Sequence, residues 1–413
     1  MSGFTYPVGL MVGGGVAEEK ILVTMTPTAG YTVGFNLTFT GSASIDFKDG
    51  GGIEPLTSGV EETHLYAGAG TYIAEITEDL ENITKFIADN SKIAIIDNFK
   101  TGLLTDLRLW GNLLTTLDLG LAPISGTVWL FNNSNLASIT FASSGNSVVT
   151  SFVADNCNLS IIDISNVPIS TTFSVINNTG LTSIAFASSG NGKIANFDFF
   201  NCNLLSLNFA NINVGGGTFR ASNNSNLASI TFASSGNTKL TAFRAALCNL
   251  LSLDLSSVPI GTTFEVNNNT LLASITFASL GNTIVSKLIA STCNLSSLDL
   301  SNLPISGQVD ISFNSNLASI TFAGSGNAPI NIFTMQNCNL PNIDFTIFGL
   351  NNSCTISQIN NAFSSTEHDN QIINIDNTGA ISGNLAILAG NNARTAASDT
   401  AYNSLIAKGW VIT

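Results

Sequence analysis

The sequence predicts a mainly β fold, in which a small β-sandwich precedes a long repeat solenoid that ends in a C-terminal cap. Three observations support this prediction. The string SNLASITFA occurs at residues 134–142, 225–233 and 315–323, and the tripeptide Cys-Asn-Leu recurs five times at intervals of 45 or 46 residues. The composition, with 44% hydrophobic and only 10% charged residues, excludes a disordered chain. Repetition at a fixed period is typical of stacked units that share one continuous core.

Two segments precede the repeats. Residues 1–20 are rich in glycine and are expected to be a mounting segment; they make a poor secretory signal, because no Lys or Arg precedes their short apolar stretch. Residues 21–82 contain IDFKDG at 45–50, which predicts a strand and a turn, and HLYAGAGTYIAEI at 64–76, which predicts a glycine turn and an alternating strand. These motifs resemble the signature of PKD-like domains. The resemblance implies an immunoglobulin-like β-sandwich.

The repeats occupy residues 83–345 and contain a finer unit. Each unit has two apolar residues separated by one residue, then Asn or Cys, then leucine, as in Phe152, Ala154, Cys157 and Leu159. Steps of 21 to 24 residues separate the ladder positions, which begin at Ser91 and continue through Asn112, Asn133, Cys157, Asn178, Cys202, Asn224, Cys248, Asn269, Cys293, Asn314 and Cys338. This pattern resembles the leucine-rich repeat. The resemblance implies a solenoid of about twelve rungs with a parallel sheet on its concave side.

The six cysteines are expected to be buried structural thiols. Five of them occupy every second rung, which places neighbours about 9–10 Å apart, whereas a disulfide needs Cα atoms closer than about 7 Å. No histidine accompanies them and no Cys-x-x-Cys pair exists, so we predict neither a metal nor a cofactor. Cys354 lies beyond the ladder, and its role stays open.

Residues 346–413 lose the period and are expected to cover the open end of the solenoid. A short helix is predicted from about Ser398 to Lys408, ended by Gly409 and followed by a closing Trp-Val-Ile strand. The pattern Asn-x-Ala…Leu-x-x-Lys-Gly-Trp is similar to the closing segments of repeat proteins from phages of Bacteroidetes bacteria. This resemblance implies a phage virion, in which the N-terminal region contacts other virion proteins.

Composition and residue chemistry narrow the function. The chain has only 13 Lys and Arg but 27 Asp and Glu, which gives a net charge of −14. This charge argues against nucleic acid and against an anionic membrane surface as binding partners. No run of 18 apolar residues exists, so no membrane insertion is predicted. His64 and His368 lie in the two end regions and assemble no Ser-His-Asp set. Asp155 and Asp198, two rungs apart, are a conceivable glycosidase pair, but we expect a non-enzymatic protein.

The concave face is the candidate binding site, because its outward residues vary between otherwise nearly identical repeats. Trp110 and Trp129 stand on adjacent rungs with Phe131 and Phe200 nearby, and such exposed aromatics predict a ligand-binding patch that arginines flank. The candidate residues are Arg108, Trp110, Trp129, Phe131, Asp155, Ile176, Asp198, Phe200, Arg220, Arg244 and Glu265. The alternatives are neutral variation of an exposed sheet and packing against a neighbouring subunit.

We therefore expect a phage tail fibre, spike or adhesin component on the virion surface that binds a host-surface glycan or protein. A homo-oligomer is compatible with the sequence. Three alternatives stay open: an extracellular leucine-rich-repeat adhesin on a bacterial cell surface, a purely structural virion subunit, and a polysaccharide-cleaving enzyme. The receptor and the oligomeric state are not predicted.

Overall fold

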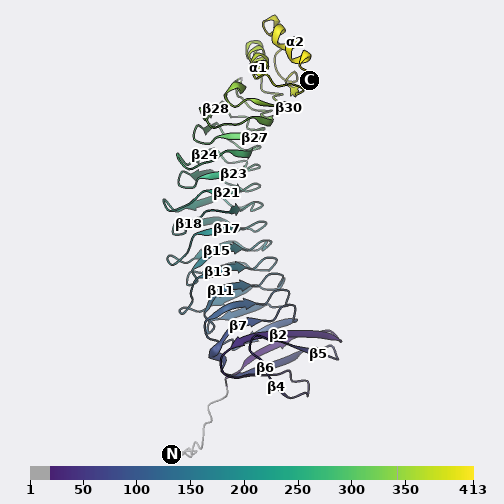
Figure 1. Cartoon of the computed structure of the whole chain (residues 1–413), viewed down its shortest axis with the longest axis vertical. Coiled ribbons are helices and arrows are strands. Elements are labelled where there is room, and N and C mark those ends of the chain that lie inside the picture. Colours follow the sequence, from purple (N-terminus) through teal and green to yellow (C-terminus); the bar gives the residue numbers. More distant parts are fainter. Residues whose placement is uncertain (1–18, 342) are drawn as a thin grey trace, which may run out of the picture.

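The computed structural model describes residues 19–341 and 343–413. The chain forms a tall column of stacked coils, with the N-terminal strands at the bottom and the helical C-terminal end at the top (Figure 1). The fold is mainly β, with about twelve turns of a parallel-strand solenoid and few helices, so the expected repeat solenoid is confirmed at this level. Residues 1–18 of the expected mounting segment lie outside the described residues.

One long sheet runs the height of the column. Its neighbouring strands pair in parallel from β7 onward, and the register places Leu107 beside Val128 and Val128 beside Phe152. The repeat period is therefore the spacing between neighbouring strands. The parallel strands are β7 (Ile83–Ile87), β9 (Leu104–Arg108), β11 (Ile124–Trp129), β13 (Val149–Val153), β15 (Ile169–Ser174), β17 (Ile194–Asp198), β19 (Thr218–Arg220), β21 (Leu240–Arg244), β23 (Ile260–Glu265), β25 (Val285–Ile289), β27 (Ile305–Asp310), β29 (Ile330–Thr334), β30 (Leu350–Ser357), β31 (Asn384–Ala386) and β32 (Val411–Ile412).

The opposite side of each coil is built from short strands and turns. These strands pair two by two in parallel. The pairs are β10 (Thr116–Leu119) with β12 (Ser138–Phe141), β14 (Ile161–Ile164) with β16 (Ser183–Phe186), β18 (Ser206–Phe209) with β20 (Ser229–Phe232), β22 (Ser252–Leu255) with β24 (Ser274–Phe277), and β26 (Ser297–Leu300) with β28 (Ser319–Phe322).

The core lies between these two sides and is continuous from coil to coil. Phenylalanines stack along it: the rings of Phe152 and Phe173 lie 5.2 Å apart at 10°, and those of Phe219 and Phe243 lie 5.2 Å apart at 4°. Each of these rings is fully buried, which contributes about 2 kcal/mol per side chain. A single coil has no second layer against which to bury such a ring, so the coils fold only as a stack.

The predicted ladder positions lie at the turn after each long-sheet strand. Asn178 is fully buried, and its Nδ2 donates to the carbonyls of Ala154 and Val175, both at 2.8 Å. Cys202 places its Sγ 3.1 Å from the Val175 carbonyl of the preceding coil. All six cysteines are free and buried, and burial raises the pKa of Cys157 and of Cys202 to about 12.

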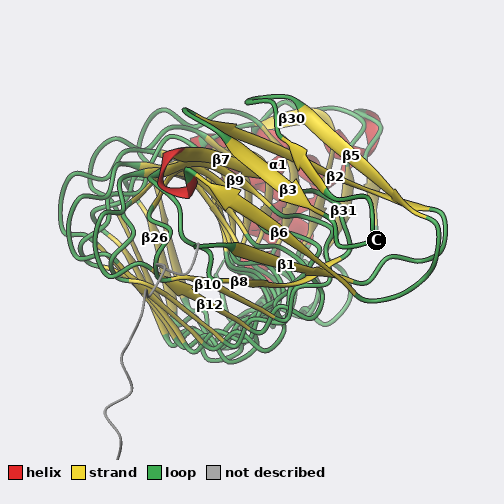
Figure 2. Ribbon diagram, turned by 90° about the horizontal axis from the view of Figure 1, so that it is seen from below, coloured by secondary structure: helices red, strands yellow, loops and turns green. Residues whose placement is uncertain are grey.

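The N-terminal strands form two sheets that continue into the first coil. One has the order β4-β3-β6-β1-β8, and in the other β2 lies between β5 and β7. Strands β7 and β8 belong to the first coil, so hydrogen bonds of both sheets cross the expected domain boundary between residues 82 and 83. Strands β1, β6 and β8 lie on the same side of the column as β10 and β12 (Figure 2). The elements are β1 (Ile21–Met25), β2 (Tyr31–Phe39), β3 (Ala43–Asp46), β4 (Ile53–Pro55), β5 (Glu61–Tyr66), β6 (Tyr72–Glu78), the 3-10 helix η1 (Leu80–Asn82) and β8 (Ile93–Asp97).

The C-terminal end continues the long sheet through β30, β31 and β32 beyond residue 345. Helix α2 (Asp399–Ala407) and the strand after it match the predicted helix and closing strand, whereas α1 (Ser365–Asn377) was not predicted. The 3-10 helices η2 (Phe345–Ile347) and η3 (Ala396–Ser398) complete this end. Of the helices described, none is long and apolar enough to span a membrane.

Candidate functional site

The candidate residues all project from the outer face of the long sheet, which we call the sheet face. Side chains alternate along a strand, so the last residue of a strand and the residue two positions later both point outward. The strand register aligns these positions into two columns. The first column contains Arg108, Trp129, Asp198, Arg220, Arg244 and Glu265, and the second contains Trp110, Phe131, Asp155, Ile176 and Phe200.

Three aromatic side chains meet at the N-terminal end of the sheet face; we call Trp110, Trp129 and Phe131 the aromatic cluster. The Trp110 and Phe131 rings stack with centroids 5.3 Å apart at 5°, and Trp129 lies 6.3 Å from Phe131. The Trp129 Nε1 donates to the Ser151 hydroxyl at 3.2 Å. The sequence predicted exposed rings, but all three are half-buried, because each covers part of its neighbour. The cluster is thus a preorganised apolar surface with part of its area still facing water.

Arg108 flanks the aromatic cluster, but its guanidinium group is already engaged. Its Nε and Nη2 donate to the two carboxylate oxygens of Asp106 at 2.8 and 2.9 Å, and its guanidinium carbon lies 4.6 Å from the Trp129 ring centroid. The forked contact that an arginine can make with a ligand carboxylate is therefore made within the chain. The nearby Asp89 is partly buried, and burial raises the pKa of its carboxyl group to about 6 against the lowering effect of Trp110 and Arg108.

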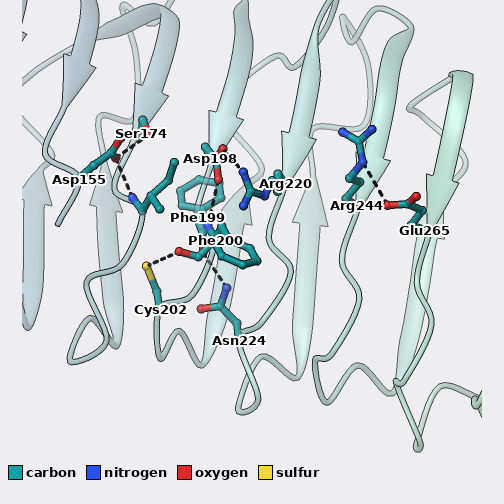
Figure 3. A network of polar contacts seen from close by, with 11 residues as sticks. Asp155, Ser174, Asp198, Phe199, Phe200, Cys202, Arg220, Asn224, Arg244 and Glu265 are labelled. Atoms are coloured by element: carbon teal, nitrogen blue, oxygen red, sulfur yellow. Dashed lines mark hydrogen bonds and ion pairs between the residues drawn. The ribbon is translucent and has the colours of Figure 1, made fainter.

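Phe200 lies apart from the aromatic cluster. The register places it three strands beyond Phe131, about 14 Å at the usual strand spacing. The Arg220 guanidinium covers its ring at 3.9 Å and donates to the Asp198 carboxylate at 3.1 Å (Figure 3). The four aromatics that the sequence grouped together therefore form two separate groups.

Arg244 and Glu265 form the next ion pair along the column. The Arg244 Nε donates to Glu265 Oε2 at 3.1 Å (Figure 3), and the other oxygen of Glu265 pairs with Lys287. Lys287, like Asp106, was not among the predicted residues. The strand register could have found both, because Asp106 and Lys287 occupy the outward positions two residues before Arg108 and Ile289.

The two carboxylates considered for glycoside cleavage are bound by their own neighbours. Asp155 Oδ1 accepts from the Ser174 hydroxyl at 2.6 Å and from the Ile176 N–H at 2.8 Å. Asp198 accepts from the Phe200 N–H and from Arg220. Burial raises the pKa of both carboxyl groups. A raised pKa is also a property of general acids.

A hollow of about 430 Å³ opens on the sheet face across β15, β17, β19 and β21. Its polar lining side chains are Thr172, Ser174, Asn196, Asp198, Thr218, Arg220 and Arg244, above the buried rings of Phe173 and Phe197. Within the described ranges, no three His, Cys, Asp or Glu side chains group closely enough to hold a metal ion.

Comparison with known proteins identifies no relative. The chain matches no family model, no curated protein and no solved structure.

Proposed function

We propose that this protein is a non-enzymatic phage virion component, a tail fibre, spike or adhesin subunit, that binds a host-surface ligand through the sheet face. The observation that carries the proposal is the aromatic cluster. Trp110 and Phe131 are locked in a parallel stack, so little side-chain entropy is lost when a ligand covers them. An aromatic anchor that becomes desolvated in this way contributes about 2 kcal/mol or more to binding.

The finer structural assignments belong to the same proposal. The solenoid is a leucine-rich repeat whose concave face is the sheet face, and residues 21–82 are a PKD-like, immunoglobulin-like sandwich that contacts other virion proteins. The two-sheet arrangement of β1 to β6 supports the second assignment. Residues 346–413 cap the column, which is supported by the burial of Trp410, whose Nε1 donates to the Ala380 carbonyl at 2.9 Å.

A double variant in virions tests the binding role. Trp110→Ala with Trp129→Ala removes most of the aromatic cluster while leaving the fully buried core unchanged. Virions that carry it are expected to assemble normally and to lose adsorption by about 30-fold or more, the equivalent of about 2 kcal/mol. Phe313→Asn is the matched control, because Phe313 is 50% exposed at a bend away from the cluster.

Each alternative function has its own outcome. Failed assembly of the double variant indicates a subunit interface, and normal adsorption with normal assembly refutes the receptor site. Detection of the protein by mass spectrometry in host envelopes but not in purified virions favours a bacterial adhesin. If the purified protein shortens host glycan chains and the Asp198→Asn variant does not, the protein is an enzyme.

A further inference from the structure

Two arginines stand side by side on the sheet face. Strands β19 and β21 pair Arg220 directly with Arg244, in a chain that has only 13 basic residues. Like charges on directly paired residues repel one another, which destabilises a sheet. Each arginine also pairs away from the other, Arg220 with Asp198 and Arg244 with Glu265 (Figure 3).

The resulting order of charges along the column is negative, positive, positive, negative. Judged from the strand spacing of about 4.8 Å, a point midway between the two arginines is about 2.4 Å along the column from each of them and about 7 Å from each flanking carboxylate. Since Coulomb energy falls with distance, attraction to the near cations exceeds repulsion from the far carboxylates. Arg220 uses only Nη1 and Arg244 only Nε in the pairs described, which leaves N–H donors on both groups.

The hollow beside these arginines has polar walls suited to a sugar. It is lined by the hydroxyl groups of Thr172, Ser174 and Thr218 and by the Asn196 amide, which can donate to and accept from sugar hydroxyls. Its volume of about 430 Å³ falls in the range of small-ligand sites, about 300–1,000 Å³.

We propose that this hollow is a subsite for a carboxylate-bearing sugar, a hexuronate residue of an acidic glycan, whose carboxylate lies between Arg220 and Arg244. The planar guanidinium fork matches a carboxylate, and the hydroxyl-lined wall matches the sugar ring. The subsite rests on the proposed function, because it extends the ligand from the aromatic cluster along the same face. A net charge of −14 disfavours densely charged polyanions such as nucleic acid.

Calorimetric titration of the full chain with trigalacturonate and with its methyl ester tests the subsite. The two trisaccharides share their hydroxyl groups and differ in the negative charge. The wild-type chain is expected to bind the acid at least 10-fold more tightly than the ester. Arg244→Gln is expected to remove this preference by weakening binding of the acid at least 10-fold.

Arg244→Gln is expected to disturb the fold least, because Glu265 keeps Lys287 as its ion-pair partner. Arg220→Gln is a second variant with the same expected loss. Arg394→Gln is the matched control, because Arg394 also forms an ion pair, with Asp399, and lies over an aromatic ring, Tyr402, at the C-terminal end of the chain. This variant is expected to bind both trisaccharides like the wild type.

Equal affinity for acid and ester, no binding of either, or a preference that survives Arg244→Gln overturns the subsite. Its failure is distinguishable from failure of the proposed function. If the tryptophan double variant loses adsorption while the charge preference is absent, only the subsite is refuted. If the charge preference is present but the tryptophan variant adsorbs normally, only the aromatic receptor site is refuted.

Discussion

The side-chain oxygen of Asn178 accepts a hydrogen bond from the backbone N–H of Leu159, one coil earlier, at 3.1 Å. Leu159 ends a tight Cys-Asn-Leu turn, in which its N–H finds no partner within its own coil. Leu181 ends a turn that is one residue longer, and its N–H donates to the backbone carbonyl of Asn178 at 2.9 Å. The following coil therefore needs no side-chain acceptor, and cysteine, in Cys202, fills the position.

The same rule explains the alternation of asparagine and cysteine along the ladder. Asparagine follows each tight turn and cysteine follows each longer turn. The repeated contacts are Leu114 N–H to Asn133, Leu204 N–H to Asn224, Leu250 N–H to Asn269 and Leu295 N–H to Asn314. Turn length in one coil thus determines the ladder residue in the next.

Asparagine and cysteine positions are expected to differ in their contribution to stability. Asn178→Ala leaves the Leu159 N–H and the carbonyls of Ala154 and Val175 without their side-chain partner. Since an unpaired buried polar group costs about 1–3 kcal/mol, the free energy of unfolding should fall by about 2–4 kcal/mol. Cys202→Ala removes only a weak donor and should cost about 1 kcal/mol. Urea denaturation followed by circular dichroism measures both.

Cys202→Asn is the control that isolates the turn-length rule. The preceding Leu181 N–H is already paired, so the new amide oxygen is buried without a donor and the variant should be less stable than the wild type. If Cys202→Asn is as stable as the wild type, or if the two alanine variants lose equal stability, the rule is wrong.

The cysteines are expected to be unreactive in the folded chain. Burial raises the pKa of Cys157 and Cys202 to about 12 and that of Cys248 to about 11, so almost no thiolate, the reactive form, exists at pH 8. Colorimetric thiol titration at pH 8 should detect none of the six thiols in buffer and all six in denaturant. Rapid reaction of one or more in buffer would show an accessible thiol and contradict the structure.

Asp89 should make stability depend on pH below neutrality. Its pKa is about 6 in the folded chain and about 3.9 in the unfolded chain, so between these values only the folded chain holds the proton. Stability therefore falls as the pH rises from about 4 to about 6, by roughly 1–2 kcal/mol for a partly exposed group. Asp89→Asn removes the ionisation and should be more stable than the wild type at pH 7.

Thermal denaturation of wild-type and Asp89→Asn chains at pH 4, 5.5 and 7 checks this prediction. The difference between the two chains should grow with pH and disappear at pH 4. A constant difference at the three pH values would show that the carboxyl group does not titrate in this range.

The sequence was sufficient for the solenoid but not for all of the site. The period of the ladder determines which strands are neighbours. The stack of coils and the two columns of outward residues therefore follow from counting residues between ladder positions. Counting also places Phe200 three strands from Phe131, a separation that the grouping of four aromatics overlooked. The ion pairs could not be derived from spacing, because Arg108 pairs with Asp106 on its own strand whereas Arg220 pairs with Asp198 on the preceding strand of the sheet. These choices depend on side-chain rotamers, not on spacing.

Helix α1 shows a signal that was present and overlooked. The run Ser-Ser-Thr-Glu at 364–367 is a capping box. Ser364 accepts from the Glu367 N–H at 3.2 Å, and Glu367 accepts from the Ser364 N–H at 2.8 Å. The loss of the 21–24-residue period after residue 345 masked this helix start.

Equilibrium binding of the purified, N-terminally labelled chain to intact host cells tests the central claim most directly, because it requires no virion assembly. Wild-type chain and the Phe313→Asn control are expected to bind with equal affinity. The chain with Trp110→Ala and Trp129→Ala is expected to bind at least about 30-fold more weakly, the equivalent of about 2 kcal/mol, while it melts as a folded solenoid. Equal binding by the folded double variant and the wild type would contradict the claim that the aromatic cluster holds the ligand.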